Sequence, residues 1–179
     1  MILLVVDTQS ALVQPELFGY QNFVCNIQKL IAQARKNKVE VVYVIHDDGA
    51  GSSLTPGQEG FEIFSGFAPR EGEKVFVKTV NSAFKDTGLE PYLQSRNQKE
   101  ILVAGLQTDK CIHATVTSGF ERGFEMLIPA GANSTVDNPY MTGEESYHYY
   151  NDFMWPGRYA RCIPMEEALA KMKEDSASR

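Results

Sequence analysis

The sequence has few cysteines, no excess of basic residues and no long hydrophobic run. Its 179 residues include only three cysteines, Cys25, Cys111 and Cys162, with no close pair among them. This sparse, odd set argues against a disulfide framework and is typical of a reduced, cytoplasmic protein. The chain has 17 basic and 23 acidic residues and a formal net charge of −6. With no basic stripe, we expect no nucleic-acid partner.

Signals for export or membrane insertion are also missing. Residues 1–6 are apolar, but Asp7 interrupts them, and neither a basic n-region nor a small-residue cleavage site is present. A signal peptide is therefore not expected. No apolar stretch approaches the length of a transmembrane helix. We expect a cytoplasmic protein with no membrane partner.

The remaining composition is that of a globular protein. Hydrophobic residues make up 43% of the chain and charged residues 22%, which excludes a disordered or fibrous class. The length suits one domain with one good core, and no repeat or linker divides it. We therefore expect a single domain over residues 1–179.

Short apolar runs recur along the chain and predict buried strands. Each run is nearly continuous in apolar residues, as in strands that are covered on both faces of a parallel sheet. The predicted strands are residues 2–7, 39–46, 74–79, 100–105 and 125–130, with a weaker sixth near 161–164.

Helical patterns lie between these runs. The first has one apolar stripe, formed by Phe23, Ile27, Leu30, Ile31 and Ala34. The others are expected over 86–97, along the face Ile112, Val116 and Phe120 before a stop at Gly123, and over 165–173. Alternation of strand and helix predicts an α/β fold with three layers, α/β/α, in which helices flank a mostly parallel, Rossmann-like sheet.

Two segments do not fit this alternation. Residues 47–72 contain six glycines and no strong periodicity. A loop this long is either functional or a surface excursion with a small apolar cluster of its own. Residues 145–155 are rich in aromatic side chains, which indicates a packed helix, an oligomer interface or a pocket wall.

Three reactive side chains lie at predicted strand ends, where ligands bind in open α/β sheets. Asp7 closes the first strand, Lys78 ends the third, and Cys111 opens the helix after the fourth. Each has a plain structural alternative. Asp7 can cap the residues that follow it, Lys78 can be an exposed strand end, and Cys111 can be a small core residue.

Together the three residues indicate covalent catalysis. The first turn of a helix and a nearby ammonium both favour the thiolate of a cysteine. Asp7 can take the thiol proton from Cys111 and later pass it to a leaving amine, while Lys78 orients Asp7. The N–H groups around 107–111 are placed to form an oxyanion hole.

Three stretches resemble the isochorismatase-like cysteine hydrolases, and the resemblance covers about residues 1–165. "LLVVDTQ" is similar to a family strand that ends in D-x-Q and supplies the aspartate, here Asp7. "VFVKTVNSAF" is similar to the K-x-x-x-S-A-F segment that supplies the lysine, here Lys78. "VAGLQTDKCIHATV" is similar to the G-x-x-T-x-x-C segment that supplies the nucleophile, here Cys111.

The resemblance implies further properties of the site. It implies a non-proline cis peptide between Leu106 and Gln107, with the N–H groups of Gln107 and Cys111 directed at the oxyanion. It also implies a homodimer or homotetramer. The segment after His46 resembles the corresponding loop of a metal-free subgroup with a G-x-x-L-x-x-G pattern. From their nearness to the motifs, the candidates for substrate binding are Gln9, His46, Ser82, Phe84 and His113.

One departure from relatives in the same superfamily bears on metals. Nicotinamidases of the superfamily hold a metal with an Asp-x-His pair and a further histidine, whereas this chain reads His46, Asp47, Asp48 and has no further histidine until His113. A zinc site of that kind therefore lacks its ligands. We expect neither a metal nor another cofactor, and nicotinamide becomes a poor candidate for the substrate.

The sequence thus predicts a hydrolase that cleaves a C–N bond of a small non-peptide amide or ureide through a thioester on Cys111. Three alternatives remain open. The chain can be a vinyl-ether hydrolase of the isochorismatase type with Cys111 as a bystander. It can be a non-catalytic binding or assembly scaffold of the same fold. It can also be a redox-sensitive thiol protein.

Overall fold

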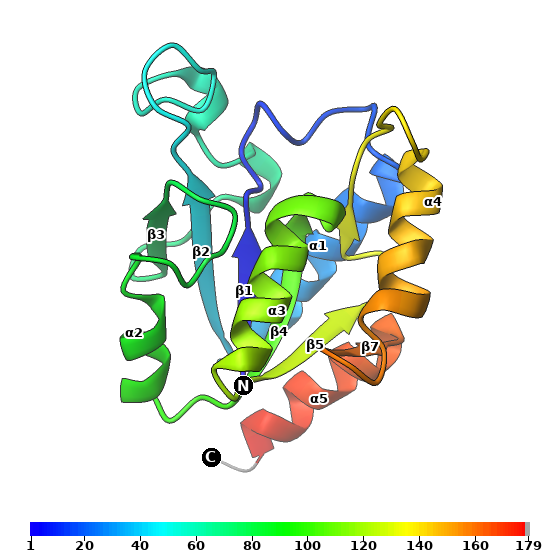
Figure 1. Cartoon of the computed structure of the whole chain (residues 1–179). Helices are drawn as coiled ribbons and strands as arrows, with labels where there is room; N and C mark the ends of the chain where they lie inside the picture. Colours follow the sequence, from blue (N-terminus) through cyan, green and yellow to red (C-terminus); the bar gives the residue numbers. More distant parts are fainter. Residues whose placement is uncertain (178–179) are drawn as a thin grey trace.

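In the computed structural model, which describes residues 1–177, the chain folds around a sheet of seven strands (Figure 1). Six strands follow the order β3–β2–β1–β4–β5–β7, β6 pairs with β4, and every pairing is parallel. The strands are β1 (Ile2–Val6), β2 (Glu40–His46), β3 (Lys74–Lys78), β4 (Glu100–Leu106), β5 (Glu125–Pro129), β6 (Asn133–Ser134) and β7 (Arg161–Ile163).

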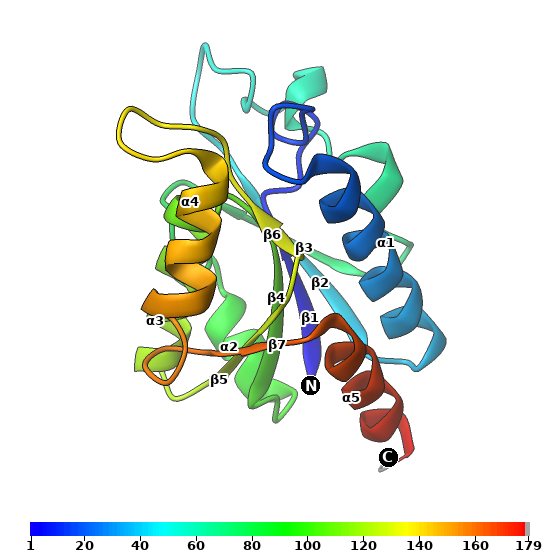
Figure 2. The same ribbon diagram turned by 90° about the vertical axis from the view of Figure 1, so that its right-hand side faces the viewer.

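Helices cover both faces of the sheet (Figure 2). On one face lie α1 (Tyr20–Lys36) and α5 (Met165–Ala177). On the other lie α2 (Leu89–Ser95), α3 (His113–Glu121) and α4 (Gly143–His148). The predicted three-layer α/β/α architecture with a parallel sheet is therefore confirmed, and the six predicted strands agree with the structure to within one residue at each end.

Strand β1 shows why its sequence is apolar at every position. Leu3 and Val5 pack into the core beneath α1 and α5, and Leu4 and Val6 pack into the core beneath α2 and α3. All are fully buried, because successive side chains of a strand point to opposite faces and both faces are covered. Burial of one such side chain contributes about 1.5–3 kcal/mol.

The helical stripes are confirmed for α1 and in part for α3. All five predicted stripe residues of α1 are buried. In α3, Val116 is buried, but Phe120 has 47% of its surface exposed, so its prediction as a core residue is wrong. Eight residues span a little over two turns, so Phe120 lies about 80° around the helix from Ile112. Its ring instead meets that of Tyr159 edge-on, 5.7 Å away.

Two parts of the second half of the chain go beyond the predicted strands and helices. Strand β6 has only two residues, and the aromatic segment forms the end of α4 continued by a π-helical segment, η4 (Tyr149–Met154). Trp155 after it is fully buried, whereas Phe153 is 71% exposed. The packed-helix interpretation therefore holds for one side of this segment.

The long loop after β2 is attached to the rest of the fold by backbone hydrogen bonds. The Phe64 N–H donates to the Thr8 carbonyl (2.9 Å), and the Ser10 N–H donates to the Glu62 carbonyl (2.8 Å). Phe67 is buried and packs its ring against Phe23, with centroids 6.3 Å apart. The loop thus has an apolar anchor, as one interpretation predicted, and it runs beside the segment that follows β1.

No helix within residues 1–177 combines the length and the apolar character that a bilayer crossing needs.

Candidate active site

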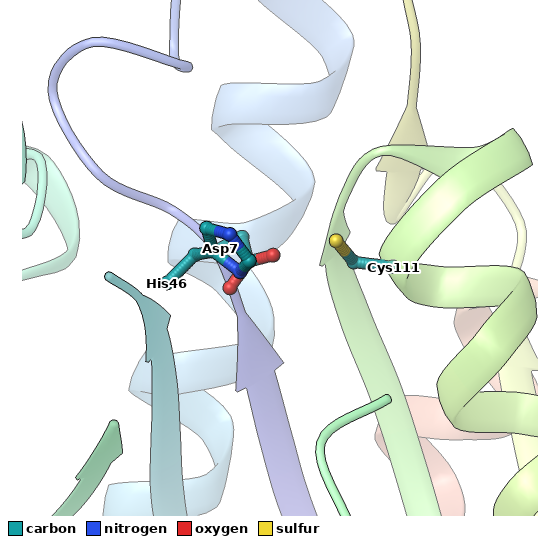
Figure 3. Close-up of side chains that lie close together, drawn as sticks. All are labelled: Asp7, His46 and Cys111. Atoms are coloured by element: carbon teal, nitrogen blue, oxygen red, sulfur yellow. The ribbon is translucent and has the colours of Figure 1, made fainter. Parts of the chain in front are cut away.

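Neighbouring strands bring the reactive side chains to one edge of the sheet. Lys78 is the last residue of β3 and pairs with His46, the last residue of β2. Asp7 follows β1, whose Val6 pairs with Val44 of β2 and with Gly105 of β4. Parallel strands end at the same edge, so side chains far apart in sequence meet here. Figure 3 shows Asp7, His46 and Cys111 close together above the strand ends.

Asp7 stands where the chain leaves the sheet. Its φ is 50°, a left-handed conformation that Asp tolerates better than most residues. Beside it, Gly105 has a φ of 131°. A Cβ at Gly105 would lie 2.0 Å from the Val6 carbonyl oxygen. Glycine is therefore required for β4 to approach β1 this closely next to Asp7.

Lys78 is the centre of the cluster. Its side chain is fully buried, and its Nζ lies 2.7 Å from Asp7 Oδ2. Nζ also lies 2.9 Å from His46 Nδ1 and 3.3 Å from Cys111 Sγ. A buried ammonium needs a charged partner and full hydrogen bonding, and these three contacts supply both.

Burial has the largest effect on the pKa values of Asp7 and Cys111. It raises the pKa of Asp7, and the Lys78 ammonium and the Cys111 thiol oppose that rise. Burial, followed by the charge of Asp7, raises the pKa of Cys111 to about 12 despite Lys78. Lys78 favours the thiolate, but burial and the charge of Asp7 outweigh its effect on the pKa of Cys111.

Cys111 lies on a π-helical segment, η3 (Thr108–Ile112), that runs directly into α3. Its Sγ points toward Asp7 (Figure 3) and donates to Asn81 Oδ1 at 3.7 Å. A buried polar network holds the segment in place. The Thr108 hydroxyl donates to Asn133 Oδ1 (2.7 Å), and the Asn133 amide donates to Asn151 Oδ1 (2.9 Å).

The peptide bond between Leu106 and Gln107 is cis, which confirms that prediction. Gln107 and Cys111 both border a cavity of about 310 Å³ that opens onto the cluster. The cavity is lined by Asp7, Leu12, His46, Asp48, Leu54, Asn81, Gln107, Lys110 and Cys111. A hollow of about 390 Å³ at Phe120 and Tyr159 contains none of the reactive groups.

Of the five residues expected to bind substrate, only His46 lines this cavity. Gln9 is fully buried and bonds the backbone of His46. The Ser82 hydroxyl accepts from the Phe84 N–H (3.2 Å), and the Phe84 ring stacks on Phe124. His113 Nδ1 accepts from the Trp155 indole at 3.2 Å, and burial lowers its pKa. These four side chains bond or pack against protein groups and do not line the cavity.

Five wall residues were not among the predicted site residues: Leu12, Asp48, Leu54, Asn81 and Lys110. Asn81 had a usable signal, since it is a polar residue inside the segment that supplies Lys78. Leu54 is the leucine of the G-x-x-L-x-x-G pattern noted above, so it also had a signal. Asp48 had none of this kind, because the path of the long loop brings it to the cavity.

Asp7, His46 and Cys111 also offer three potential metal-ligand atoms within 4.8 Å of one another. The Lys78 ammonium, however, lies within hydrogen-bond distance of all three side chains. A metal ion at this point would have to displace a buried cation. The residues present therefore do not fit a metal centre.

With this geometry in view, the chain was compared with known proteins. Residues 1–146 match the isochorismatase domain. The chain belongs to the isochorismatase family. A solved structure from Chromobacterium violaceum is described as a hydrolase of the isochorismatase family. Its TM-score to this family member is 0.90, and the two sequences are 27% identical. The alignment covers 97% of this chain and 93% of the Chromobacterium chain.

Two curated relatives share about a third of the aligned residues. The secreted isochorismatase effector of Verticillium dahliae is 32% identical over 115 residues, 64% of this chain. Streptothricin hydrolase of Streptomyces noursei is 32% identical over 142 residues, 76% of this chain. The chain spans 60% and 50% of the lengths of these two proteins.

Proposed function

We propose that this isochorismatase-family protein is a cysteine hydrolase that cleaves the C–N bond of a small non-peptide amide or ureide. The observation that carries the proposal is the buried Lys78 ammonium, which contacts both Asp7 and Cys111 at the cavity. A nucleophile, a base and an electrostatic partner in mutual contact are what covalent acyl transfer requires. Streptothricin hydrolase, a relative of this chain, is named for hydrolysis.

The reaction begins when Asp7 accepts the proton of the Cys111 thiol. Asp7 Oδ1 is buried and has no hydrogen-bond partner among residues 1–177, so it is available for this proton. Sγ then forms a bond to the substrate carbonyl carbon, and the carbonyl electron pair moves to oxygen. In this proposal the N–H groups of Gln107 and Cys111 stabilise the resulting oxyanion.

The second half of the reaction releases both products. The oxyanion collapses, the C–N bond breaks, and the leaving amine takes the proton held by Asp7. Asp7, again a carboxylate, removes a proton from water, which attacks the thioester. The C–S bond breaks, the acid leaves, and Cys111 recovers its proton from Asp7.

The raised pKa of Cys111 suits a thiol that is activated only during the reaction. In the resting site, Asp7 and Lys78 hold one negative and one positive charge. Transfer of the proton from Cys111 to Asp7 keeps the net charge of the cluster unchanged, with Lys78 now beside a thiolate. This avoids a second buried anion, which is costly at low dielectric.

The cavity favours a small substrate. Its volume of about 310 Å³ lies at the lower end of the range for small-molecule sites. Leu12 and Leu54 supply apolar walls, and Asn81 supplies a polar one. A cavity of this size and lining suits a compact amide or ureide better than a peptide chain.

The test combines a panel of small amides and ureides with intact-protein mass spectrometry. We expect at least one substrate to leave an acyl adduct on Cys111 and to be turned over. The adduct should disappear in Cys111→Ala and persist in Cys162→Ala. Cys162 is a matched control, because burial raises its pKa to about 12 as well, yet it is remote from Lys78 in the sheet.

Iodoacetamide gives a readout that does not depend on the substrate. At pH 8 we expect Cys111 to react at least tenfold faster than Cys162, and we expect Asp7→Asn to remove this difference. Equal rates for the two cysteines would contradict the proposal. Hydrolysis that survives Cys111→Ala would instead indicate chemistry of the vinyl-ether type.

A further inference from the structure

The hydrogen bonds of Lys78 indicate which ring nitrogen of His46 serves as an acceptor. An ammonium has three N–H donors and no acceptor. The three neighbours of Nζ are Asp7 Oδ2 (2.7 Å), His46 Nδ1 (2.9 Å) and Cys111 Sγ (3.3 Å). Each N–H therefore has one acceptor, and Nδ1 of His46 must be unprotonated to serve as one of them. The proton of the neutral imidazole then lies on Nε2.

The surroundings of His46 fix it in this role. Gln9 donates from Nε2 to the His46 carbonyl (2.9 Å) and accepts from the His46 N–H at Oε1 (2.8 Å). Gln9 is itself fully buried, so the end of β2 is tied to the segment after β1. On the outer side, His46 Nε2 faces the Asp48 carboxylate at 3.6 Å, which favours the proton on that nitrogen.

We propose that His46 is a positioning residue that holds the Lys78 ammonium in the orientation that serves both Asp7 and Cys111. It does so by accepting the third N–H of Lys78. The inference rests on the proposed function, because it assumes that Cys111 is the nucleophile. His46 thereby joins Asp7, Lys78 and Cys111 in the cluster, and it acts through Lys78.

The consequence for Cys111 follows from the strengths of the three bonds. The contact with Asp7 is charge-assisted and short, whereas the sulfur of Cys111 is a weak acceptor. If His46 no longer accepts, one N–H of Lys78 is left without a partner in a buried site. The ammonium then turns toward another acceptor, and the weak contact with Cys111 is the first to lengthen. Lys78 then stabilises the developing thiolate less.

Two substitutions separate this role from simple packing. In His46→Asn, the side-chain oxygen lies near the position of Nδ1, so an acceptor is retained. In His46→Leu, a side chain of similar bulk fills the space and accepts nothing. A third variant, Lys74→Gln, changes an exposed lysine at the start of β3, the strand that ends at Lys78, and serves as the control.

The readout is the rate of Cys111 alkylation by iodoacetamide between pH 6 and 9, followed by peptide mass spectrometry. We expect His46→Leu to lower the rate at pH 8 about tenfold, the effect of losing one hydrogen bond of ordinary strength. His46→Asn should stay within about threefold of the wild-type rate, because one acceptor of similar strength replaces another. The control Lys74→Gln should react at the wild-type rate. Once a substrate is known, His46→Leu should lower kcat and leave KM unchanged.

Several results would overturn the inference. Equal alkylation rates in wild type and His46→Leu would show that Cys111 does not depend on the acceptor. An equal fall in the Asn and Leu variants would assign the effect to packing. A raised KM with unchanged alkylation would make His46 a substrate contact. In long-range ¹H–¹⁵N spectra at pH 8, we expect the Nε2–H tautomer of His46, and the Nδ1–H tautomer would contradict the proposed bond.

This experiment also distinguishes a failure of the inference from a failure of the proposed function. If wild-type Cys111 reacts no faster than Cys162, the proposed function fails, and the role of His46 fails with it. If wild-type Cys111 reacts fast and the two His46 variants react equally fast, only the inference fails.

Discussion

The buried pair formed by Lys78 and Asp7 gives a stability prediction that can be worked out in numbers. Lys78→Met keeps most of the bulk of the side chain and removes its charge. The charged atoms are 2.7 Å apart, which corresponds to an attraction of about 6 kcal/mol at an effective dielectric constant of about 20. Removal of one partner from a buried pair typically destabilises a protein by about 3–5 kcal/mol.

Protonation of Asp7 sets an upper limit on the stability that Lys78→Met loses, and it makes this loss depend on pH. Without Lys78 the pKa of Asp7, already raised by burial, rises further. The folded variant then avoids a buried charge by binding a proton. For a group with an unfolded pKa of about 3.9, this proton costs about 4 kcal/mol at pH 7 and about 1.5 kcal/mol at pH 5.

The sign follows from linkage. A carboxyl whose pKa is raised by folding binds more protons in the folded than in the unfolded state. Its stability contribution is therefore complete below the unfolded pKa and is lost as the pH rises toward the folded pKa. We expect the deficit of Lys78→Met against wild type to shrink by up to about 1.4 kcal/mol for each pH unit between pH 7 and pH 5.

Urea denaturation followed by tryptophan fluorescence measures this deficit. Trp155 is the single tryptophan and is fully buried, so its emission reports global unfolding. Lys74→Met, at an exposed position of the same strand, should stay within about 0.5 kcal/mol of wild type. The double variant Asp7→Asn with Lys78→Met should lose the pH dependence of the deficit, because no titrating group remains at the pair.

Two results would refute the reasoning. The first is a Lys78→Met variant as stable as wild type at pH 7. The second is a deficit that is the same at pH 5 and pH 7. Either result would mean that the carboxylate of Asp7 does not depend on the ammonium for its charged state.

Three further predictions concern the surroundings of the site. Gly105→Ala places a Cβ 2.0 Å from the Val6 carbonyl oxygen at a φ of 131°. We expect the free energy of unfolding, measured by urea denaturation, to fall by about 3 kcal/mol or more. A urea midpoint equal to that of wild type would contradict the close approach of β4 to β1. Asn133→Ala removes the partner of the Asn151 amide and should destabilise by about 1–3 kcal/mol for each polar group left unpaired. In calorimetry, each kcal/mol corresponds to roughly 2–4 °C of Tm in a chain of this size. Because burial lowers the pKa of His113, wild type loses stability as the pH falls through the unfolded value of about 6.5; His113→Phe should lose less between pH 7 and pH 5, and an equal loss would show that His113 titrates normally.

Much of the fold could be predicted because its signals are local. Strand β1 is apolar at each of its five positions. A short run of this kind is typical of a strand that is covered on both faces of a sheet. Strand β6 gave no such signal, because Asn133 and Ser134 are polar and the strand has only two residues. It exists because it pairs with the end of β4, and such a pairing is not visible in the sequence of either strand.

The site divides in the same way. Asp7, Lys78 and Cys111 were found because each follows or ends an apolar run, and the structure brings all three together. The walls were largely missed. Asp48 reaches the cavity through a loop whose path depends on backbone hydrogen bonds, and backbone hydrogen bonds leave little trace in side-chain patterns.

The position of the reactive groups at strand ends has a consequence for engineering. Asp7, His46 and Lys78 lie on or next to neighbouring strands whose spacing the sheet fixes, whereas Leu12, Asp48 and Leu54 belong to connecting segments. Reactivity and selectivity are therefore encoded in separate parts of the chain. A library that randomises only the connecting segments can change which molecule is accepted while it leaves the spacing of the reacting atoms intact.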